Sequence, residues 1–269
     1  MSGALIVCPT PIGNLADITL RVLDTLNAAD GAACEDTRHS QTLLRRHGIS
    51  LPLISLTEHN EAARIPGLVE RISAGKRICL LSDAGMPALS DPGSRLIAAV
   101  LAAGLPVEVL PGPSAVTAAL VASGMAGGGF VFAGFLPKSP PAIGRLLDRL
   151  DVPGLPVVAF ESPRRLPATL AALAARDPSR PLAVCRELTK LHEDVVRGEA
   201  AEVAEQFTEP PRGEITLVLG GAEPGPAPID DAVLRELAAA VGARRAAGIA
   251  SSLSGNPRNA IYRRLTGGQ

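Results

Sequence analysis

The chain has 269 residues, of which 46% are apolar but only 2% are aromatic, and its formal net charge is −1. This length allows two modest domains with a substantial core. With no Trp, one Tyr and five Phe, the core has to be built from Ala, Val, Leu and Ile. A platform of several exposed rings for stacking nucleic-acid bases is therefore disfavoured.

None of the four cysteines belongs to a Cys-x-x-Cys pair, so zinc and thioredoxin-type sites lack support. Each cysteine falls in or beside a predicted strand and is expected to be a small buried apolar residue, which fits a reduced, cytoplasmic setting. The N-terminus lacks the basic region of a signal peptide. The nearly uncharged stretch 96–137 is interrupted by Pro and Gly, so no membrane-spanning window of about 20 apolar residues is expected.

Residues 1–123 predict an N-terminal α/β domain in which strands and helices alternate. Helices are predicted at about 19–27, up to about His47, through an imperfect segment broken near Pro66, and from Ser114 to about Val121, with Asp17 or Thr19 as the first N-cap. Strands separated by helices predict a parallel sheet, whose polar loops converge on one edge. The predicted strands are 5–8, 31–34, 53–56, 78–81 and 107–110.

A Gly-rich segment at 124–129 marks a predicted boundary, followed by a mixed α/β domain over 124–222. Only two clear helices, at about 141–150 and 165–175, separate its apolar runs, so its sheet is predicted to be mixed. A linker at 222–228 precedes a basic, helix-turn-helix-like tail at 229–269. The predicted strands of this second domain are 130–133, 157–160, 182–185, 194–197 and 215–219.

The most informative stretch is the loop that follows the predicted strand 78–81. Two prolines stiffen it, and Gly85 and Gly93 permit close backbone approach. Such a loop at the carboxyl end of a central strand is where open α/β sheets bind ligands, and this position favours a functional role for Asp83. Asp91 is instead predicted to cap the following helix, with Pro92 at a first helical position.

Several familiar motifs are absent from the sequence. There is no Walker-type G-x-x-x-x-G-K-[ST] and no G-x-G-x-x-G after the first strand, so P-loop and Rossmann nucleotide sites are disfavoured. There is no H-E-x-x-H and no G-x-S-x-G. The four histidines are scattered, and no metal site is predicted.

Charge is distributed unevenly along the chain. From Leu237 onward there are five arginines and no acidic residue. A basic terminal helix pair beside an acidic body suggests contact with a polyanion. A solvated helix face explains the charge alone equally well.

Seven short motifs, in this order, resemble one family. They are Thr-Pro-Ile-Gly-Asn-Leu-Ala-Asp-Ile-Thr at 10–19, Glu-Asp-Thr-Arg at 35–38, Ser-Asp-Ala-Gly-Met-Pro-Ala-Leu-Ser-Asp-Pro-Gly at 82–93, Pro-Gly-Pro-Ser-Ala at 111–115, Gly-Phe-Leu-Pro at 134–137, Glu-Ser-Pro at 161–163 and Arg-Glu-Leu-Thr-Lys at 186–190. The chain resembles the bacterial 16S ribosomal RNA 2′-O-ribose cytidine methyltransferases of the tetrapyrrole-methylase superfamily, over residues 5 to about 265.

The resemblance implies two α/β domains of the class III methyltransferase type, with S-adenosyl-L-methionine in the cleft between them. It also implies 16S rRNA as partner, within the small ribosomal subunit, and a homodimer. Cofactor contacts are implied for Ile12, Asp83, Ala84, Gly85, Met86, Ser114, Ala115, Phe160 and Glu214.

The residues make this cofactor site plausible. Asp83 suits a positive group or ribose hydroxyls, and backbone N–H groups at Gly85 and at the helix start after Pro113 suit a carboxylate. Apolar side chains, among them Ile12 and Met86, can exclude water.

Transfer of a methyl group to a ribose hydroxyl requires alignment and benefits from a general base. Glu35 and Lys190 are the preferred catalytic candidates, with Asp36, Glu58 and Glu161 as alternatives. A local ion pair that supports the helix start is an equally simple role for Glu35 and Arg38. Predicted RNA contacts are Arg38, Arg164, Arg165, Arg244, Arg245, Arg258, Arg263 and Arg264.

Two other functions stay open at this point. One is methylation of a precorrin-type or other small molecule on the same fold, which would not need the Arg-rich tail. The other is a non-catalytic RNA-binding or ribosome-assembly factor, which would not bind S-adenosylmethionine. Fold likeness alone does not separate them.

Overall fold

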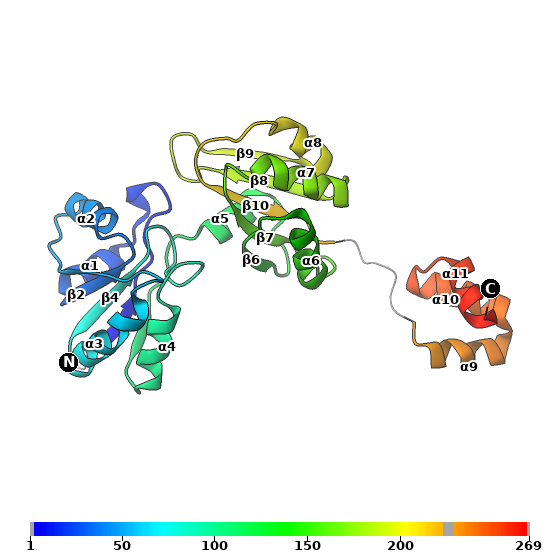
Figure 1. Ribbon diagram of the computed structural model, residues 1–269, viewed down its shortest axis with the longest axis horizontal. Helices are drawn as coiled ribbons and strands as arrows, with labels where there is room; N and C mark the ends of the chain where they lie inside the picture. The colour runs from blue at the N-terminus through cyan, green and yellow to red at the C-terminus, as the bar shows by residue number, and fades with distance from the viewer. Residues whose placement is uncertain (1–2, 223–228, 268–269) are drawn as a thin grey trace. The chain divides into compact units, whose positions relative to one another are not determined.

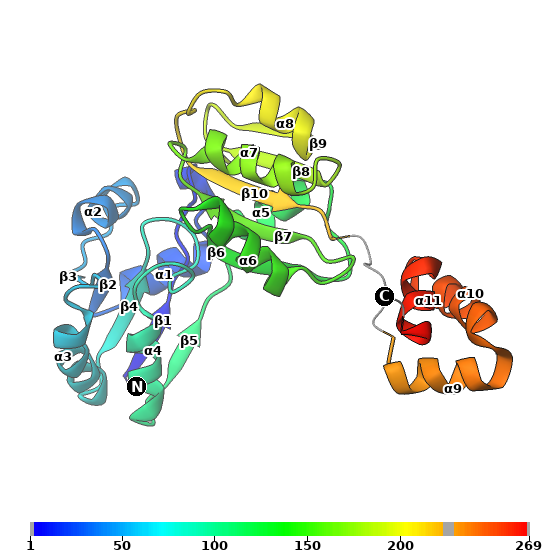
Figure 2. The same ribbon diagram turned by 45° about the vertical axis from the view of Figure 1, so that its right-hand side comes forward.

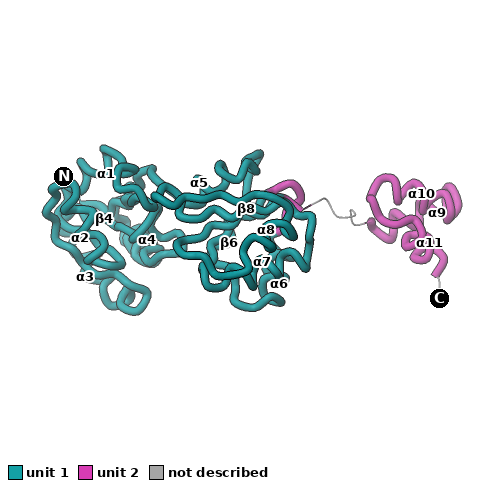
Figure 3. The backbone as a smooth tube through the Cα atoms, turned by 90° about the horizontal axis from the view of Figure 1, so that it is seen from above, with its two compact units in different colours: residues 1–150, 156–220 teal, residues 151–155, 221–269 magenta. Residues whose placement is uncertain are grey.

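The computed structural model of the chain describes residues 3–222 and 229–267. The chain divides into two compact units, shown in Figure 3: residues 1–150 with 156–220, and residues 151–155 with 221–269. The first unit contains two five-stranded sheets. The predicted linker 222–228 lies, apart from Ala222, outside the described residues.

The first sheet (Figure 1) is parallel throughout, and its strand order, β3-β2-β4-β1-β5, can be followed from the labels in Figure 2. The five predicted strands are confirmed to within one residue at either end. Their side chains do not alternate in polarity because helices cover both faces of the sheet. The strands are β1 (Ala4–Val7), β2 (Gly31–Cys34), β3 (Leu53–Ser55), β4 (Arg77–Leu81) and β5 (Val107–Val109).

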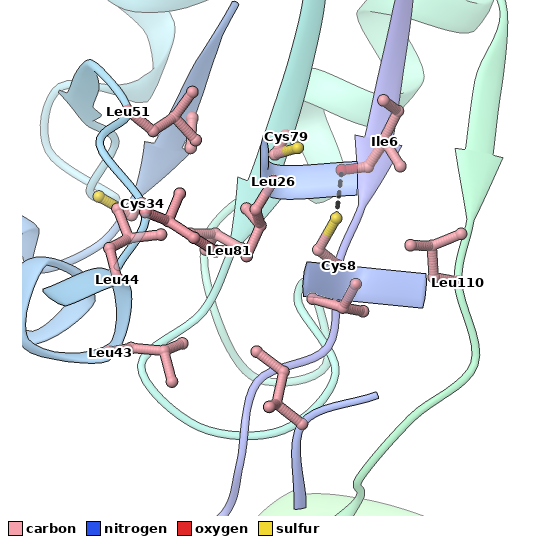
Figure 4. Packing of buried hydrophobic residues seen from close by; sticks show 14 of the residues in the cluster. Ile6, Cys8, Leu26, Cys34, Leu43, Leu44, Leu51, Cys79, Leu81 and Leu110 are labelled. Carbon is pink, nitrogen blue, oxygen red and sulfur yellow. Dashed lines mark hydrogen bonds between the residues drawn. The ribbon is translucent and has the colours of Figure 1, made fainter. Parts of the chain in front are cut away.

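Helices α1 (Leu20–Ala28) and α2 (Thr37–Arg46) pack on one face, around a core that includes Ile6, Leu26 and Leu44 (Figure 4). On the opposite face lie α3 (Glu61–Ser73) and α4 (Ser94–Ala102). A short 3-10 helix, η1 (Leu15–Asp17), precedes α1. Of the two predicted caps, Thr19 is the N-cap of α1, since its side chain accepts a hydrogen bond from the Val22 N–H.

Two predictions for this sheet are wrong. Helix α3 runs through Pro66 without a break. Because Pro66 has no N–H, the Ala62 carbonyl lacks its usual helical donor. Both residues lie on the exposed face of the helix, where water can satisfy the Ala62 carbonyl.

Asp91 does not cap α4, and Pro92 is not helical. The N-cap is Gly93, with φ of 123°, and its N–H donates to the buried carboxylate of Glu61 at 3.1 Å. A side chain distant in sequence therefore takes the role predicted for the local aspartate.

The second sheet is mixed, as predicted, with strand order β6-β7-β10-β8-β9. Only β6 and β7 are parallel, and the other three pairs are antiparallel. The predicted strands agree to within two residues. They are β6 (Val131–Phe135), β7 (Val157–Glu161), β8 (Pro181–Arg186), β9 (Asp194–Glu199) and β10 (Ile215–Leu219).

Helices α6 (Pro140–Leu150), α7 (Leu166–Arg176) and α8 (Ala200–Gln206) cover one face of this sheet (Figure 2). Helix α5 (Ala115–Ala122) packs on the other face. Helix α8 was not predicted. It has only seven residues, too few for a clear period, and a capping box between Glu199 and Glu202 begins it.

The described part of the second unit contains α9 (Asp231–Val241), α10 (Ala243–Ser254) and α11 (Arg258–Thr266), so the tail predicted at 229–269 is helical. They pack around Leu234, Ala247, Ala250 and Ile261. None of the described helices is long and apolar enough to span a membrane.

Candidate active site

A cavity of about 380 Å³ lies between the two sheets of the first unit. Its size is in the range of small-molecule sites. The loops after β1, β4 and β5 form one wall, and strands of the second sheet with their adjoining loops form the other. All nine residues with a predicted cofactor role are in the lining: Ile12, Asp83, Ala84, Gly85, Met86, Ser114, Ala115, Phe160 and Glu214.

The loops after β1 and β4 are bound together at the first wall. The Thr10 N–H donates to the Gly85 carbonyl at 2.9 Å, and the Gly85 N–H donates to the Thr10 carbonyl at 3.0 Å. The predicted use of the Gly85 N–H for a ligand carboxylate is therefore wrong. Gly85 is required for its φ of 76°, and a Cβ there would lie 3.3 Å from Cγ2 of Ile12.

Two loops beside the cavity hold backbone in a strained conformation. Within the described residues, positive φ in non-glycine residues occurs only at Ala88 and Ser90 in one loop and at Glu187 and Thr189 in the other. A strained backbone conformation of this kind is kept only where the surrounding structure holds it in place, and such residues cluster at functional sites. The strain is consistent with loops that are built to fixed positions for a ligand.

Carboxylates gather at one edge of the cavity. Burial raises the pKa of Asp91 to about 6, and the charges of Glu35 and Asp83 add to the effect. Burial also raises the pKa of Glu35, helped by Asp83 and Glu58. Because these carboxylates repel one another, a cationic ligand group at this edge would relieve their repulsion.

The N-terminus of α5 provides a positive edge. Ser114 is its N-cap but makes no side-chain capping bond. In the described part of the chain, the N–H groups of the first turn, at 115–117, have no hydrogen-bond acceptor. Unpaired N–H groups and the helix dipole favour an anion there.

The wall from the second sheet is more apolar. Phe160, Leu188 and Ile215 line it together with Cys185. Burial raises the pKa of the Cys185 thiol to about 11, so it stays neutral near pH 7. This wall suits a flat, weakly polar ring.

The two preferred catalytic candidates lie outside the lining. Lys190 Nζ is 2.7 Å from Glu187 Oε1 and 2.9 Å from Glu214 Oε2. Burial alone would lower the pKa of Lys190, but its hydrogen bonds to these two carboxylates outweigh burial and raise it. Lys190 is therefore a charged partner rather than a free amine base. Glu35 is half-buried and electrostatically coupled to the lining residues Asp83 and Asp91.

Two alternative bases are held in local interactions. Glu161 lines the cavity, but its fully buried carboxylate accepts from the Ser162 N–H at 2.5 Å and the Thr169 hydroxyl at 2.6 Å and pairs with Arg165 at 2.5 Å. Asp36 is the N-cap of α2, and the Arg38 N–H lowers the pKa of its carboxyl. The third, Glu58, is exposed.

The arginines predicted to bind RNA differ in availability. Arg38 has a side chain 91% exposed, beside Asp36 at 3.5 Å. Arg164 is exposed, whereas Arg165 pairs with the buried Glu161. In the second unit, Arg264 pairs with Asp231 at 2.5 Å and donates to the Ile229 carbonyl at 3.1 Å.

The other four arginines of the second unit that were predicted to bind RNA are exposed. Arg245 and Arg258 line a shallow hollow on α10 with Gly248 and Ser252. The Arg258 guanidinium lies over Gly248, since a Cβ built there would be in ordinary contact with Arg258 Nε at 3.7 Å. Arg244 and Arg263 complete the set.

Sequence reasoning missed part of the lining. Asp91 was assigned to a helix cap, and Phe135 and Leu89 were given no role, yet all three line the cavity. Both Asp91 and Leu89 belong to the 82–93 motif, and Phe135 belongs to the Gly-Phe-Leu-Pro motif. The motifs contained the signal, but which way each side chain points was not readable from them.

Comparison with known proteins places the chain in a family. Residues 4–204 match the model for tetrapyrrole (corrin/porphyrin) methylases, and residues 224–267 match the model for the RsmI C-terminal HTH domain. The "Ribosomal RNA small subunit methyltransferase I" of Mesorhizobium japonicum is 44% identical over 98% of this chain and 92% of its own length. The protein of that name from Thermotoga maritima is 43% identical over 82% of this chain and 100% of its own length.

Solved structures share the fold at lower identity. Diphthine synthase has a TM-score of 0.62 at 14% identity, over 81% of this chain and 90% of that one. Uroporphyrin-III C-methyltransferase from Thermus thermophilus, complexed with S-adenosylhomocysteine, has a TM-score of 0.55 at 20% identity, over 80% of this chain and 96% of that one.

The chain therefore belongs to the tetrapyrrole methylases, in the family of its relatives named ribosomal RNA small subunit methyltransferase I. It is a methyltransferase, and its methyl donor is S-adenosylmethionine. The cavity fits this donor, which carries a sulfonium cation, an ammonium, a carboxylate and a flat adenine. The carboxylate edge, the free N–H groups of α5 and the apolar wall match these features respectively.

Proposed function

We propose that this chain methylates the 2′ oxygen of a cytidine ribose in 16S rRNA, within the small ribosomal subunit. The observation that carries the proposal is the cavity lined by acidic side chains and by the N-terminus of α5, in a chain that also carries an arginine-rich helical unit. The relatives at 43–44% identity bear ribosomal RNA methyltransferase names, whereas the tetrapyrrole enzymes share only the fold.

When bound, S-adenosylmethionine supplies an activated methyl group on sulfur. Asp83 and Asp91 favour a positive group of the donor, and the N–H groups at the start of α5 hold its carboxylate. Ile12, Met86 and Phe160 exclude water. With these groups fixed in place, much of the catalytic effect comes from alignment.

Glu35 is the proposed general base for the ribose hydroxyl. Its carboxyl has a pKa raised by burial and by Asp83, which brings it nearer the operating pH of a base. Lys190 orders the 187–190 loop through its two carboxylate partners. This assignment separates the two preferred catalytic candidates into a proton acceptor and a positioning residue.

RNA binding is assigned to the exposed arginines. Arg38 and Arg164 contact phosphates near the cavity, and Arg244, Arg245, Arg258 and Arg263 contact the backbone from the second unit. Arg165 and Arg264 act through their internal partners instead. A homodimer in the bacterial cytoplasm, where ribosomal subunits are found, completes the proposal.

Small subunits that lack the modification test the proposed function. Incubation with methyl-labelled S-adenosylmethionine is expected to transfer label to one cytidine ribose, mapped by nuclease digestion and mass spectrometry. An Asp83→Ala variant should stay folded, lose donor binding in calorimetry and transfer no label. Label on a base, label on protein, or no label in RNA from the wild-type chain contradicts the proposal.

A further inference from the structure

Strand β6 contains a bulge just before the cavity. Val131 pairs with Val157 and Phe132 with Val158, but Phe135 pairs with Phe160, so the register shifts between Phe132 and Phe135. Three residues of β6 thus span two residues of β7. Gly134 has φ of 67°, a conformation that favours glycine.

The bulge decides which face of the sheet Phe135 occupies. Val131, Ala133 and Leu136 pack into the core under α6 and α7, whereas Phe132 packs on the opposite face. Strict alternation from Ala133 would put Phe135 in that helix-covered core. The extra residue turns Phe135 to the face of Phe132 and Phe160, and it lines the cavity.

The Phe135 ring packs against a neighbouring ring on one side but stays exposed to solvent. Its ring centroid is 5.4 Å from that of Phe160, which in turn lies 5.2 Å from that of Phe132. Three of the six Phe and Tyr residues in the sequence therefore gather at this point. Phe135 is still 58% exposed, which is expensive for a large apolar side chain that a regular strand would bury.

The enclosed wall and the exposed ring suit different ligands. Cys185 is 1% exposed, Ile215 4% and Leu188 8%, so this wall suits the adenine of the donor, a group that is buried on binding. Phe135 instead presents a ring open to solvent at the edge of the same cavity. A second, larger ligand that enters from solvent can cover it.

We propose that Phe135 is the surface on which the base of the methylated nucleotide stacks. Sequence-specific recognition of RNA targets unpaired nucleotides whose bases are splayed onto aromatic side chains. A base held on Phe135 would fix its attached ribose, so the 2′ hydroxyl is presented to the cavity. This inference rests on the proposed RNA substrate and adds the residue that positions the nucleotide.

Four variants and two measurements test this role: Phe135→Ala, Phe135→Leu, Phe135→Trp, and Phe130→Ala as the control. Phe130 is 39% exposed and precedes the same strand, outside the cavity lining. Steady-state kinetics on unmodified small subunits would give kcat and KM for RNA. Calorimetry would give the Kd for S-adenosylmethionine and shows that each variant is folded and competent to bind it.

Loss of one stacking contact corresponds to roughly a 10-fold or greater change in affinity. We expect Phe135→Ala and Phe135→Leu to lower kcat/KM for RNA by about that factor, mainly through KM, and Phe135→Trp to stay near the wild type. The donor Kd and the Phe130→Ala kinetics should be unchanged.

Three results would overturn the stacking role. The first is that Phe135→Ala weakens donor binding as much as it lowers kcat/KM, because the ring then contacts adenine. The second is that Phe135→Leu behaves as the wild type, because an aromatic ring is then not required. The third is that Phe135→Ala has the same kinetics as Phe130→Ala. A wild-type chain that methylates no RNA refutes the proposed function itself, and the stacking role with it.

Discussion

Asp91 gives the sharpest prediction, because its cost to the folded protein can be worked out. Burial, with the charges of Glu35 and Asp83, raises its pKa to about 6, against about 3.9 in an unfolded chain. Between these values the folded state holds the proton more tightly. The free energy of unfolding therefore falls as the pH rises through this window.

The size of the effect follows from the shift. One pKa unit is worth about 1.4 kcal/mol. Because Asp91 is only half-buried, solvent screening reduces the free-energy cost of its ionisation in the folded state to roughly 2 kcal/mol. We expect Asp91→Asn to raise the free energy of unfolding by about 2 kcal/mol at pH 7.5. The gain should shrink as the pH falls through this window and vanish below pH ~3, where the wild-type carboxyl is protonated in both states.

Urea denaturation followed by circular dichroism, from pH 4.5 to pH 8, measures this difference directly. Asp24→Asn, on the exposed side of α1, is the matched control and should leave the pH dependence unchanged. The same Asp91→Asn variant should bind S-adenosylmethionine more weakly, since the repulsion it relieves is what favours a cationic ligand. A pH profile of Asp91→Asn parallel to the wild type, or a loss of stability at pH 7.5, would refute the reasoning.

Three further predictions concern residues with assigned partners. Glu161→Ala should lower the free energy of unfolding by about 3–5 kcal/mol in urea denaturation, because Arg165, Thr169 and the Ser162 N–H lose a fully buried acceptor. A loss below about 1 kcal/mol would show that the carboxylate is dispensable for stability. Lys190→Arg should leave the pH–rate profile of methyl transfer unchanged, since the side chain serves as the charged partner of Glu187 and Glu214. Disappearance of an ionisation from the profile would instead identify Lys190 as the general base. Arg245→Ala should weaken RNA binding and reduce the salt dependence of binding by about one phosphate contact. Arg264→Ala removes an internal ion pair, so it should cost at most about 1 kcal/mol of stability and leave the salt dependence of RNA binding intact. Equal salt slopes for both variants would contradict this division of the arginines.

Much of the fold was predictable because its signals are local. Apolar runs without alternation mark strands covered on both faces, and the strands of the first sheet agree with the structure to within one residue. Residues such as Asp83 and Ser114 were placed together because loops after parallel strands meet at one edge. That rule needs only the order of elements.

Two wrong predictions come from local sequence preference alone. The break expected at Pro66 and the cap expected at Asp91 were both inferred from neighbours in sequence. In the structure, the lost hydrogen bond at Pro66 faces solvent, and Glu61, from another helix, satisfies the N-terminus of α4. Solvent exposure overrides the local preference at Pro66, and a side chain that only folding brings near overrides it at Asp91.

The sequence by itself determined the two-sheet architecture, the family and the loops that form the cavity, because these depend on residue type and order. Only the tertiary structure decided how side chains in those loops are used. Lys190 is a charged partner of two carboxylates, Asp91 lines a cavity instead of capping a helix, and one extra residue in β6 turns Phe135 to the cavity face. Direction, burial and pairing depend on contacts between segments far apart in the chain, and no local pattern encodes those.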